Sequence, residues 1–382
     1  MRRGAGKMME EGMAFEDVLA ELERFKEQDL KYTRILSSMC TDPHPIAKIA
    51  HRLFLEANLG DPGLFPGAKA IEERTISMIA DLLGGDDTVR GYLTTGGTES
   101  NIQAIRAFRN AAQIRDGNII VPQSAHFSFD KIGDLLAVEV RKAPFDASFR
   151  VDPDAVEELI DDRTIGIVAI AGTTEYGQID PIEALAEIAR RNNLFLHVDA
   201  AFGGFVIPFL DSHPPFDLSV EGVSSITIDP HKMGMSTIPS GGLLFKDGTL
   251  LDFLSTPTPY LTSKNQFSLT GTRSGATAAS TYAVLRHLGR RGFKQIVDRC
   301  MQMTAKLRSG TESAGITSPV EPMMNVLTLE VANLEQVIER LAQSGWRVSV
   351  TRDGFMRLVI MPHLTEPIID EFLSDLEDAT KD

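Results

Sequence analysis

An aspartate, a histidine and a lysine stand at or just beyond the ends of three apolar runs that predict β-strands. Asp199 is the last residue of one run, and His126 and Lys232 each follow the end of another by four residues. In an open parallel sheet, the carboxyl ends of the strands meet along one edge, and ligands bind there. This spacing therefore predicts that a carboxylate, an imidazole and an amine line a common site.

Each of these residues has an ordinary structural role and a chemical alternative. Lys232 follows His231 and precedes Met and Gly; most lysines are solvated surface residues, but a partly desolvated amine forms imines readily. Asp199 either caps the next turn or, if buried, needs a cationic partner such as the protonated ring nitrogen of a heterocycle, which the small Ala201 would leave accessible. His126 is a satisfied structural histidine, a proton carrier near neutral pH or a flat surface for an aromatic ring.

A glycine-rich turn, TTGGTESN, precedes a predicted helix over residues 101–114. Gly97 and Thr98 in this turn would offer N–H groups and a hydroxyl at the positive end of the helix dipole, where phosphate binds. The alternative is an ordinary turn with a threonine cap, and neither known nucleotide-binding loop pattern is present. A phosphate site, a ring clamp, a strand-end carboxylate and an amine together match what pyridoxal 5′-phosphate (PLP) requires.

Apolar runs alternate with amphipathic helical patterns through the middle of the chain, which predicts an α/β fold with a mostly parallel sheet covered on both faces. Beyond residue 275, two long helices and then strands around a helix predict a smaller α+β domain. We therefore expect an N-terminal helical segment (1–60), a large α/β domain (61–275) and a small C-terminal domain (276–382). The predicted strands are 91–95, 118–122, 138–141, 165–171, 194–199, 225–228 and 242–245, then 325–331, 346–350 and 356–361; the predicted helices are 15–30, 45–57, 69–83, 101–114, 154–160, 182–191 and 334–343.

The composition argues against several classes of protein. The 382 residues carry 38 Lys and Arg against 53 Asp and Glu, a formal charge of −15, which disfavours binding to nucleic acid or to an anionic membrane surface. Two cysteines, Cys40 and Cys300, are too few for a disulfide scaffold or a cysteine-rich metal site. No segment approaches the ~18 apolar residues of a membrane span. We expect a cytoplasmic protein with no metal, nucleic-acid or membrane partner.

Six segments resemble the group II PLP-dependent amino-acid decarboxylases: TGGTESN, SAHFSFDK, AGTTEYGQIDPI, LHVDAAFGG, DPHKMG and GTRSG. The resemblance covers nearly all of the chain after residue 15 and is nearest to the archaeal L-tyrosine/L-aspartate decarboxylase branch. It implies the PLP-dependent transferase-like fold of aspartate aminotransferase (fold type I) and a homodimer with a shared active site. The implied activity is decarboxylation of L-tyrosine to tyramine for methanofuran, or of L-aspartate to β-alanine for coenzyme A, through an external aldimine and a quinonoid.

The resemblance also implies a role for each residue around the cofactor. Lys232 would hold PLP as the internal aldimine, and Asp199 would pair with the pyridinium nitrogen. His126 would stack on one face of the ring and Ala201 would pack on the other. The phosphate would contact Gly97, Thr98 and His231, and Thr174 would lie near the ring substituents.

Further implied roles concern the substrate and the partner subunit. Arg357 would bind the substrate α-carboxylate, although a surface arginine in a half-exposed strand is the alternative. Tyr260, in a turn-rich stretch typical of a lid, would return the proton to Cα, with His126 as the other candidate. Thr272 and Arg273 would reach the phosphate of the partner's cofactor. An aspartate pocket would need a second cation, for which Arg273 and Lys264 are the candidates.

Two other functions are compatible with part of the pattern. Position 229 is Asp, where animal members of the family usually carry Asn, and the sphingosine-1-phosphate lyase branch also has an Asp near its His-Lys pair. A PLP-dependent aldehyde lyase of that type is therefore the main alternative. A catalytically silent PLP-fold binding protein is disfavoured, because Lys232, Asp199 and His126 are all present.

Overall fold

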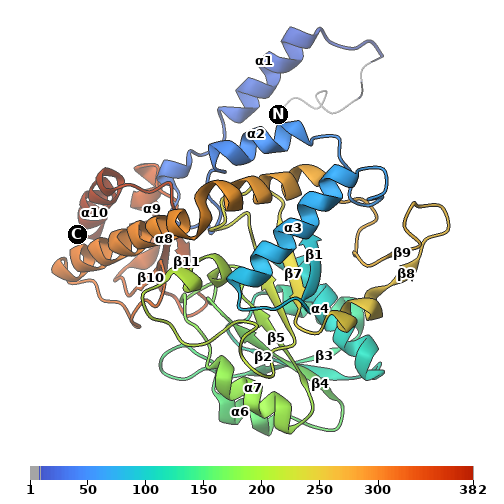
Figure 1. Cartoon of the computed structure of the whole chain (residues 1–382). Helices are drawn as coiled ribbons and strands as arrows, with labels where there is room; N and C mark the ends of the chain where they lie inside the picture. Colours follow the sequence, from blue (N-terminus) through green and yellow to red (C-terminus); the bar gives the residue numbers. More distant parts are fainter. Residues whose placement is uncertain (1–7, 9, 382) are drawn as a thin grey trace.

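The computed structural model describes residues 8 and 10–381 of the chain. Its main sheet has seven strands: β1 (Arg90–Thr94), β2 (Asn118–Pro122), β3 (Glu139–Ala143), β4 (Thr164–Ile170), β5 (Phe195–Asp199), β6 (Ser225–Ile228) and β7 (Gly241–Phe245). Their order across the sheet is β1-β7-β6-β5-β4-β2-β3 (Figure 1). Only β7 runs against its neighbours, and the other adjacent pairs are parallel. The predicted mostly parallel sheet is confirmed.

Helices cover both faces of this sheet, because the strand residues alternate between two apolar cores. In β2, Ile119 and Val121 belong to the core that includes α4 (Gly97–Ala112) and α5 (Ser128–Leu136). Ile120 between them belongs to the opposite core. The helices of that opposite core include α3 (Pro66–Leu82), α6 (Pro153–Glu158), α7 (Ile182–Arg191) and α8 (Gly275–Ser313).

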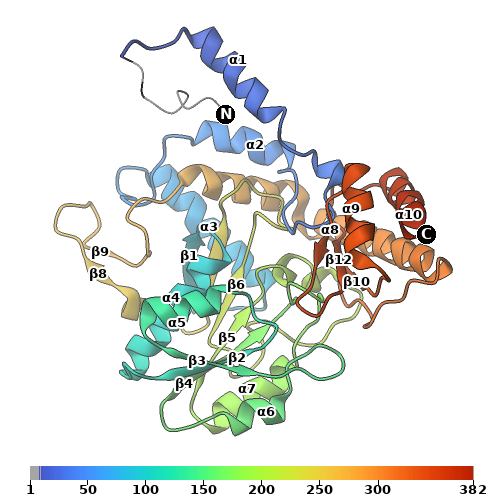
Figure 2. The ribbon, with the colours of Figure 1, turned by 180° about the vertical axis from the view of Figure 1, so that it is seen from behind.

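The C-terminal part of the chain builds a second, smaller sheet. The long helix α8 leads to it and changes direction at Gly289, whose φ of 56° and ψ of −177° are not helical. The antiparallel sheet has the order β10-β12-β11 and lies beside two helices (Figure 2). The expected α+β unit at this end of the chain is thus present. Its elements are β10 (Val326–Leu329), α9 (Leu334–Gln343), β11 (Ser349–Val350), β12 (Met356–Val359) and α10 (Glu366–Thr380).

Three segments lie at the periphery of this body. Helix α1 (Phe15–Lys26) projects from it, and α2 (Pro45–Leu53) lies alongside α8 (Figure 1). A hairpin of β8 (Thr256–Pro257) and β9 (Asn265–Gln266) extends from the right-hand side of the view. Among the helices that the structure describes, none combines the length and the apolar character that a membrane crossing requires.

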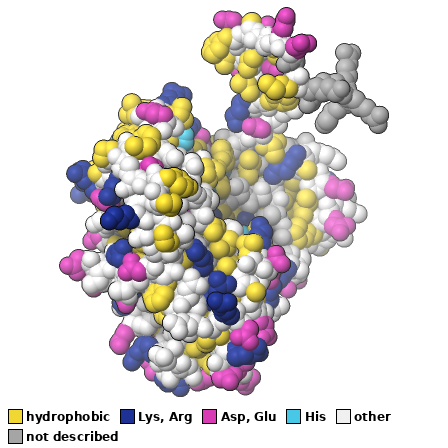
Figure 3. Space-filling model, turned by 90° about the vertical axis from the view of Figure 1, so that its right-hand side faces the viewer, with side chains coloured by type: hydrophobic (Ala, Val, Ile, Leu, Met, Phe, Trp, Pro, Cys, Tyr) yellow, Lys and Arg dark blue, Asp and Glu magenta, His cyan; other side chains and the backbone are white. Residues whose placement is uncertain are grey.

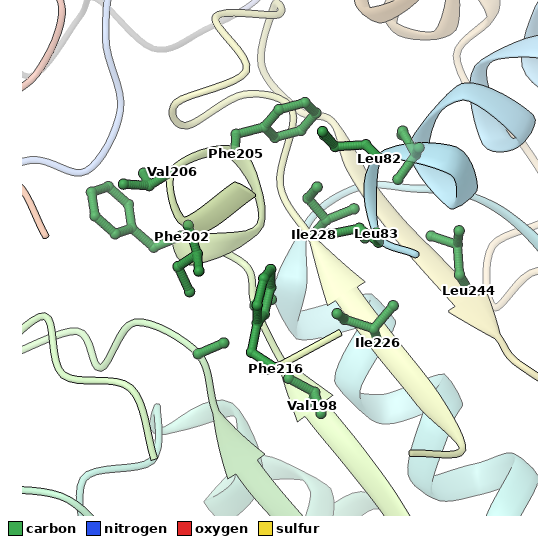
Figure 4. Close-up of a cluster of buried hydrophobic side chains, with 14 of the residues drawn as sticks. Leu82, Leu83, Val198, Phe202, Phe205, Val206, Phe216, Ile226, Ile228 and Leu244 are labelled. Carbon is green, nitrogen blue, oxygen red and sulfur yellow. The ribbon is translucent and has the colours of Figure 1, made fainter. Parts of the chain in front are cut away.

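A cluster of buried side chains fixes the carboxyl ends of β5 and β6. Val198 of β5 and Ile226 and Ile228 of β6 point into one group with Phe205 and Phe216 (Figure 4). Phe205 belongs to the short 3₁₀ turn that follows β5. The turn after Asp199 is therefore packed against the neighbouring strand, which restricts where that carboxylate lies.

The same turn supplies a test of the packing. A Cβ atom at Gly203 would collide with the carbonyl oxygen of Ala171, to which the Gly203 N–H donates at 3.1 Å. We expect Gly203→Ala to lower the free energy of unfolding by about 1–3 kcal/mol in urea denaturation. The control is Gly67→Ala in α3, where a Cβ meets no atom within 4 Å, and it should be neutral or stabilising by up to ~1 kcal/mol. Equal stability of both variants and the wild type would contradict this packing.

Candidate active site

A cavity of about 290 Å³ lies at the carboxyl ends of β1, β2, β4, β5 and β6. These strands run in one direction, so the loops that follow them converge on the same edge of the sheet. The structure brings together most of the residues that the sequence singled out. The predicted residues in its wall are Gly97, Thr98, His126, Thr174, Asp199, Ala201, His231 and Lys232.

Lys232 enters the cavity from the turn after β6. Its backbone N–H donates to the carbonyl of Asp229 at 3.0 Å, and its Nζ lies 3.3 Å from Asp229 Oδ2. The Asp229 side chain is buried, and within the described part of the chain its Oδ1 has no hydrogen-bond partner. The amine is thus held by one carboxylate oxygen, while the other is left for a donor that the protein does not supply.

Asp199 presents a buried carboxylate, 6% exposed, to the same space. Its Oδ1 accepts from the N–H of Ala201 at 3.1 Å and its Oδ2 from Asn101 Nδ2 at 2.8 Å. No lysine, arginine or histidine of residues 8 and 10–381 forms a salt bridge with it. A buried carboxylate without a cation is costly, so Asp199 fits a ligand that carries a positive charge.

His126 lies at the start of α5, where its Nδ1 accepts from the backbone N–H of Ser128 at 3.2 Å. Burial lowers the pKa of His126, and the charge of Lys232 lowers it further, against an opposite effect of Asp199. The ring is therefore neutral at physiological pH. A neutral imidazole with one free nitrogen can stack on an aromatic ring or carry a proton.

The part of the cavity wall at the start of α4 suits an anion. Gly96 has φ = 147°, a conformation that glycine adopts readily, and α4 begins at the next residue. The N–H groups of a first helical turn lack intrahelical partners and lie at the positive end of the dipole. A Cβ on Gly97 would come within 3.2 Å of Ala201 Cβ, so glycine lets this backbone approach closely. The geometry of this turn therefore suits an anion such as a phosphate group.

His231 stands beside this turn, with its Nδ1 hydrogen-bonded to the carbonyl oxygen of Ser240. Burial lowers the pKa of His231, but its neighbours Cys40 and Asp229 outweigh burial and raise that pKa above its usual value. A histidine with more cationic character favours an anion next to it. An amine, an uncompensated carboxylate and an anion-binding turn in one cavity fit PLP.

Four predicted residues lie outside this cavity. Tyr260 is 85% exposed on the β8–β9 hairpin, which also carries Lys264. Thr272 is exposed, whereas Arg273 is half-buried and forms an ion pair with Glu72. Arg273 therefore points into its own chain. The structure does not bring any of these four side chains to the amine of their own subunit.

Arg357, on β12, also lies outside the cavity wall and is half-buried. Its Nη2 donates to the carbonyl oxygen of Ser37 at 2.7 Å, and its Nε has no partner among the described residues. Burial lowers the pKa of Arg357, against the effect of Glu175. Within the described part of the chain, this guanidinium has an unused donor and forms no salt bridge with a carboxylate.

Four polar residues of the cavity wall were not predicted as site residues: Thr95, Glu99, Asn101 and Asp229. Asn101 lies four residues after Gly97, which is about one turn of α4. Residues at this spacing share a helix face, so its position on the cavity side of α4 could have been inferred. Asp229 was noted only as a departure from the family pattern. Its Lys232 partner lies three residues later, and that spacing indicated a contact within one turn.

The sequence model of the family described as "Pyridoxal-dependent decarboxylase conserved domain" matches residues 63–317. The chain belongs to this family. The match runs from before α3 to the end of α8 and contains every strand of the main sheet. The protein is a PLP-dependent amino-acid decarboxylase, as the sequence predicted.

Curated relatives extend the similarity over nearly the whole chain. A "Probable L-tyrosine/L-aspartate decarboxylase" of Methanothrix thermoacetophila is 56% identical over 97% of both chains. One of Methanosarcina barkeri, with the same description, is 53% identical over 98% of this chain and 99% of its own. A "Probable L-aspartate decarboxylase" of Archaeoglobus fulgidus is 49% identical over 94% and 98%, respectively.

Solved structures agree with the fold. The sphingosine-1-phosphate lyase of Burkholderia pseudomallei superposes with a TM-score of 0.90 at 27% identity, over 98% of this decarboxylase and 92% of the lyase. Glutamate decarboxylase of Lactobacillus brevis gives a TM-score of 0.91 at 22% identity, over 98% and 93%. The expected fold class is confirmed.

The position of Lys232 leads to a direct test of cofactor attachment. We expect Lys232→Ala to lose the yellow absorbance of the bound cofactor after dialysis, because no other lysine of the described residues lines the cavity wall. Lys294→Ala, which removes a surface amine paired with Asp211 and Asp298, should keep the wild-type spectrum. Absorbance spectra of both dialysed variants test this expectation. Retention of the yellow colour by Lys232→Ala would refute the assignment of Lys232 as the residue that attaches the cofactor.

Proposed function

We propose that this decarboxylase acts on L-aspartate and L-tyrosine, releasing β-alanine and tyramine. The main support is that Lys232, Asp199 and His126 line one cavity. In addition, the chain is 49–56% identical to relatives described as probable decarboxylases of these amino acids. The two products would serve coenzyme A and methanofuran biosynthesis, respectively. A cytoplasmic location agrees with two cysteines that form no disulfide.

In this proposal, the chain's own groups place the reacting bond. PLP supplies an electron sink for the pair left at Cα when the bond to the carboxylate breaks and carbon dioxide leaves. The Lys232 amine would hold PLP, and Asp229 Oδ2, 3.3 Å from its Nζ, keeps that amine in the cavity. The Asp199 carboxylate would pair with the ring nitrogen, and the first turn of α4, at Gly97 and Thr98, would bind the phosphate.

One proton must return to Cα to complete the amine. His126 is the candidate within the chain, because it lines the cavity and an imidazole can take up and release a proton near neutral pH. Tyr260 is exposed on a projecting hairpin and does not line its own subunit's cavity. In a homodimer with a shared site, this hairpin would serve the partner's cavity instead, and the exposed Thr272 beyond it would lie near the partner's phosphate.

Arg357 is the proposed site for the substrate α-carboxylate, because its Nε is buried and unused by the described residues. A charge-assisted hydrogen bond contributes roughly 1.5–3 kcal/mol. We therefore expect Arg357→Gln to lower kcat/KM by about 10- to 100-fold, mainly through KM. Arg74→Gln, on the exposed side of α3, is the matched control and should leave steady-state kinetics unchanged. An unaltered KM in folded Arg357→Gln would exclude the role.

The homodimer is supported by the surface of α1. Phe15, Val18, Leu19, Leu22 and Phe25 are exposed at helical spacing, and none of the helix is buried. Hydrophobic side chains are visible on this projecting segment in Figure 3. An apolar stripe of this kind is typical of an interaction surface. A second copy of the chain is the occupant that we propose.

Leu22→Asp combined with Phe25→Asp tests this interface. Burying a carboxylate in an apolar contact costs more free energy than the contact contributes. The double variant should therefore shift the molecular mass from that of a dimer toward that of a monomer in size-exclusion chromatography with light scattering. Glu16→Gln, in the first turn of the same helix, should remain dimeric. A monomeric wild type would contradict the dimer, and a dimeric double variant would place α1 outside the interface.

Product analysis tests the substrate proposal. Purified enzyme loaded with PLP is incubated with a panel of L-amino acids, and carbon dioxide and amines are followed by mass spectrometry. β-Alanine from aspartate and tyramine from tyrosine are expected. An aldehyde and phosphoethanolamine from a phosphorylated sphingoid base, with no amine from any amino acid, would instead assign the lyase reaction.

A further inference from the structure

One buried amide joins the elements that carry the catalytic groups. Asn101 is 1% exposed, and its Nδ2 donates to Asp199 Oδ2 at 2.8 Å and to Ser128 Oγ at 3.2 Å. Its Oδ1 accepts from Thr227 Oγ1 at 2.9 Å and lies 3.0 Å from His197 Nε2. The amide thus uses all four of its hydrogen-bonding positions, and it connects α4, α5, β5 and β6.

The hydrogens in this network have one consistent arrangement. A carboxylate only accepts hydrogen bonds, so the NH₂ group of Asn101 faces Asp199 and its oxygen faces His197. His197 Nε2 must then carry the hydrogen that it donates to Asn101. Burial lowers the pKa of His197 to about 4, so the ring is neutral at pH 7 and its Nδ1 accepts from Ser225 Oγ at 2.8 Å.

The result is a directed chain that ends on the carboxylate. Ser225 donates to His197, His197 donates to Asn101, and Asn101 donates to Asp199. His197 is 0% exposed and does not line the cavity, so it acts on the site only through this chain. Hydrogen bonds in series polarise one another, and donors around a carboxylate favour its charged form.

We propose that Asn101 and His197 are positioning residues that hold the Asp199 carboxylate in the orientation that pairs with the ring nitrogen of PLP and keeps that nitrogen protonated. Asp199 forms no salt bridge with a cation in residues 8 and 10–381, so the N–H groups of Asn101 and Ala201 are what compensates its charge before the cofactor binds. The inference rests on the cofactor that the family uses and is independent of which amino acid is the substrate.

A merely structural role would predict different behaviour. The same hydrogen bonds tie α4 to β5 and β6 through Thr227 and His197, so losing them lowers stability in either case. Only a positioning role alters the protonation of the cofactor's ring nitrogen. The deciding measurement therefore observes that nitrogen directly, in the holoenzyme and without substrate.

The experiment compares His197→Phe, which removes the donor and keeps a planar ring, with His197→Gln, whose amide can still donate to Asn101. Nitrogen-15 NMR of holoenzyme loaded with PLP labelled at the ring nitrogen reports the protonated fraction, and titration gives the PLP dissociation constant. We expect His197→Phe to shift the nitrogen signal toward the neutral pyridine and to bind PLP about tenfold more weakly. His197→Gln should restore most of both properties.

A second test variant and a control variant separate this effect from a loss of stability. Thr227→Val removes only one donor to the Asn101 oxygen, so it should show a smaller shift in the same direction and serves as the deciding variant if His197→Phe does not fold. Thr304→Val removes a comparably buried hydroxyl, which donates to Cys300 in α8. It should lower thermal stability without changing the ring-nitrogen signal or the affinity for PLP.

A cofactor analogue provides the final comparison. With 1-deaza-PLP, in which carbon replaces the ring nitrogen, the wild type and His197→Phe should bind with equal affinity. A ring nitrogen that stays protonated in both folded variants, His197→Phe and Thr227→Val, would overturn the proposal. An equal affinity loss of His197→Phe for PLP and for the analogue would overturn it as well, because the network would then support only the fold.

Discussion

The buried charge of Asp199 is the constraint on which the rest of the active site depends. An ionised carboxylate away from water requires donors or a cation, and here the protein provides the donors of Ala201 and Asn101 and no salt-bridging cation among the described residues. The missing positive charge is the property that a protonated cofactor ring brings. The Asp199 carboxylate therefore favours a cofactor whose ring carries a positive charge.

The sheet positions the other groups relative to that carboxylate. Parallel strands place the loops after β1, β2, β4, β5 and β6 on one edge, so that Gly97, His126, Thr174, Asp199 and Lys232 come from five separate segments and meet in one cavity. Apolar packing between β5, β6 and the turn after β5 fixes two of these loops (Figure 4). The geometry of the cavity thus depends on the parallel direction of these strands and on the apolar core that packs against β5 and β6.

Local sequence patterns predicted most of the elements. The strands 118–122 and 225–228 and the helix 182–191 begin and end where the structure has them, because apolar runs and helical periodicity are local signals. Helix α5 was missed, since its nine residues follow His126 without a side-chain cap. The bend in α8 depends on Gly289, whose backbone angles no periodicity reveals.

The sequence by itself determined the fold class, the cofactor and three residues of the cavity wall, because Lys232, Asp199 and His126 stand at strand ends and strand ends in a parallel sheet converge. Only the tertiary structure decided which side chains support them. The link from His197 through Asn101 to Asp199 joins residues 96 and 98 positions apart. Likewise, Arg273 turns inward to Glu72, 201 positions away. Such contacts depend on how helices and strands pack across the core, which local residue order does not specify.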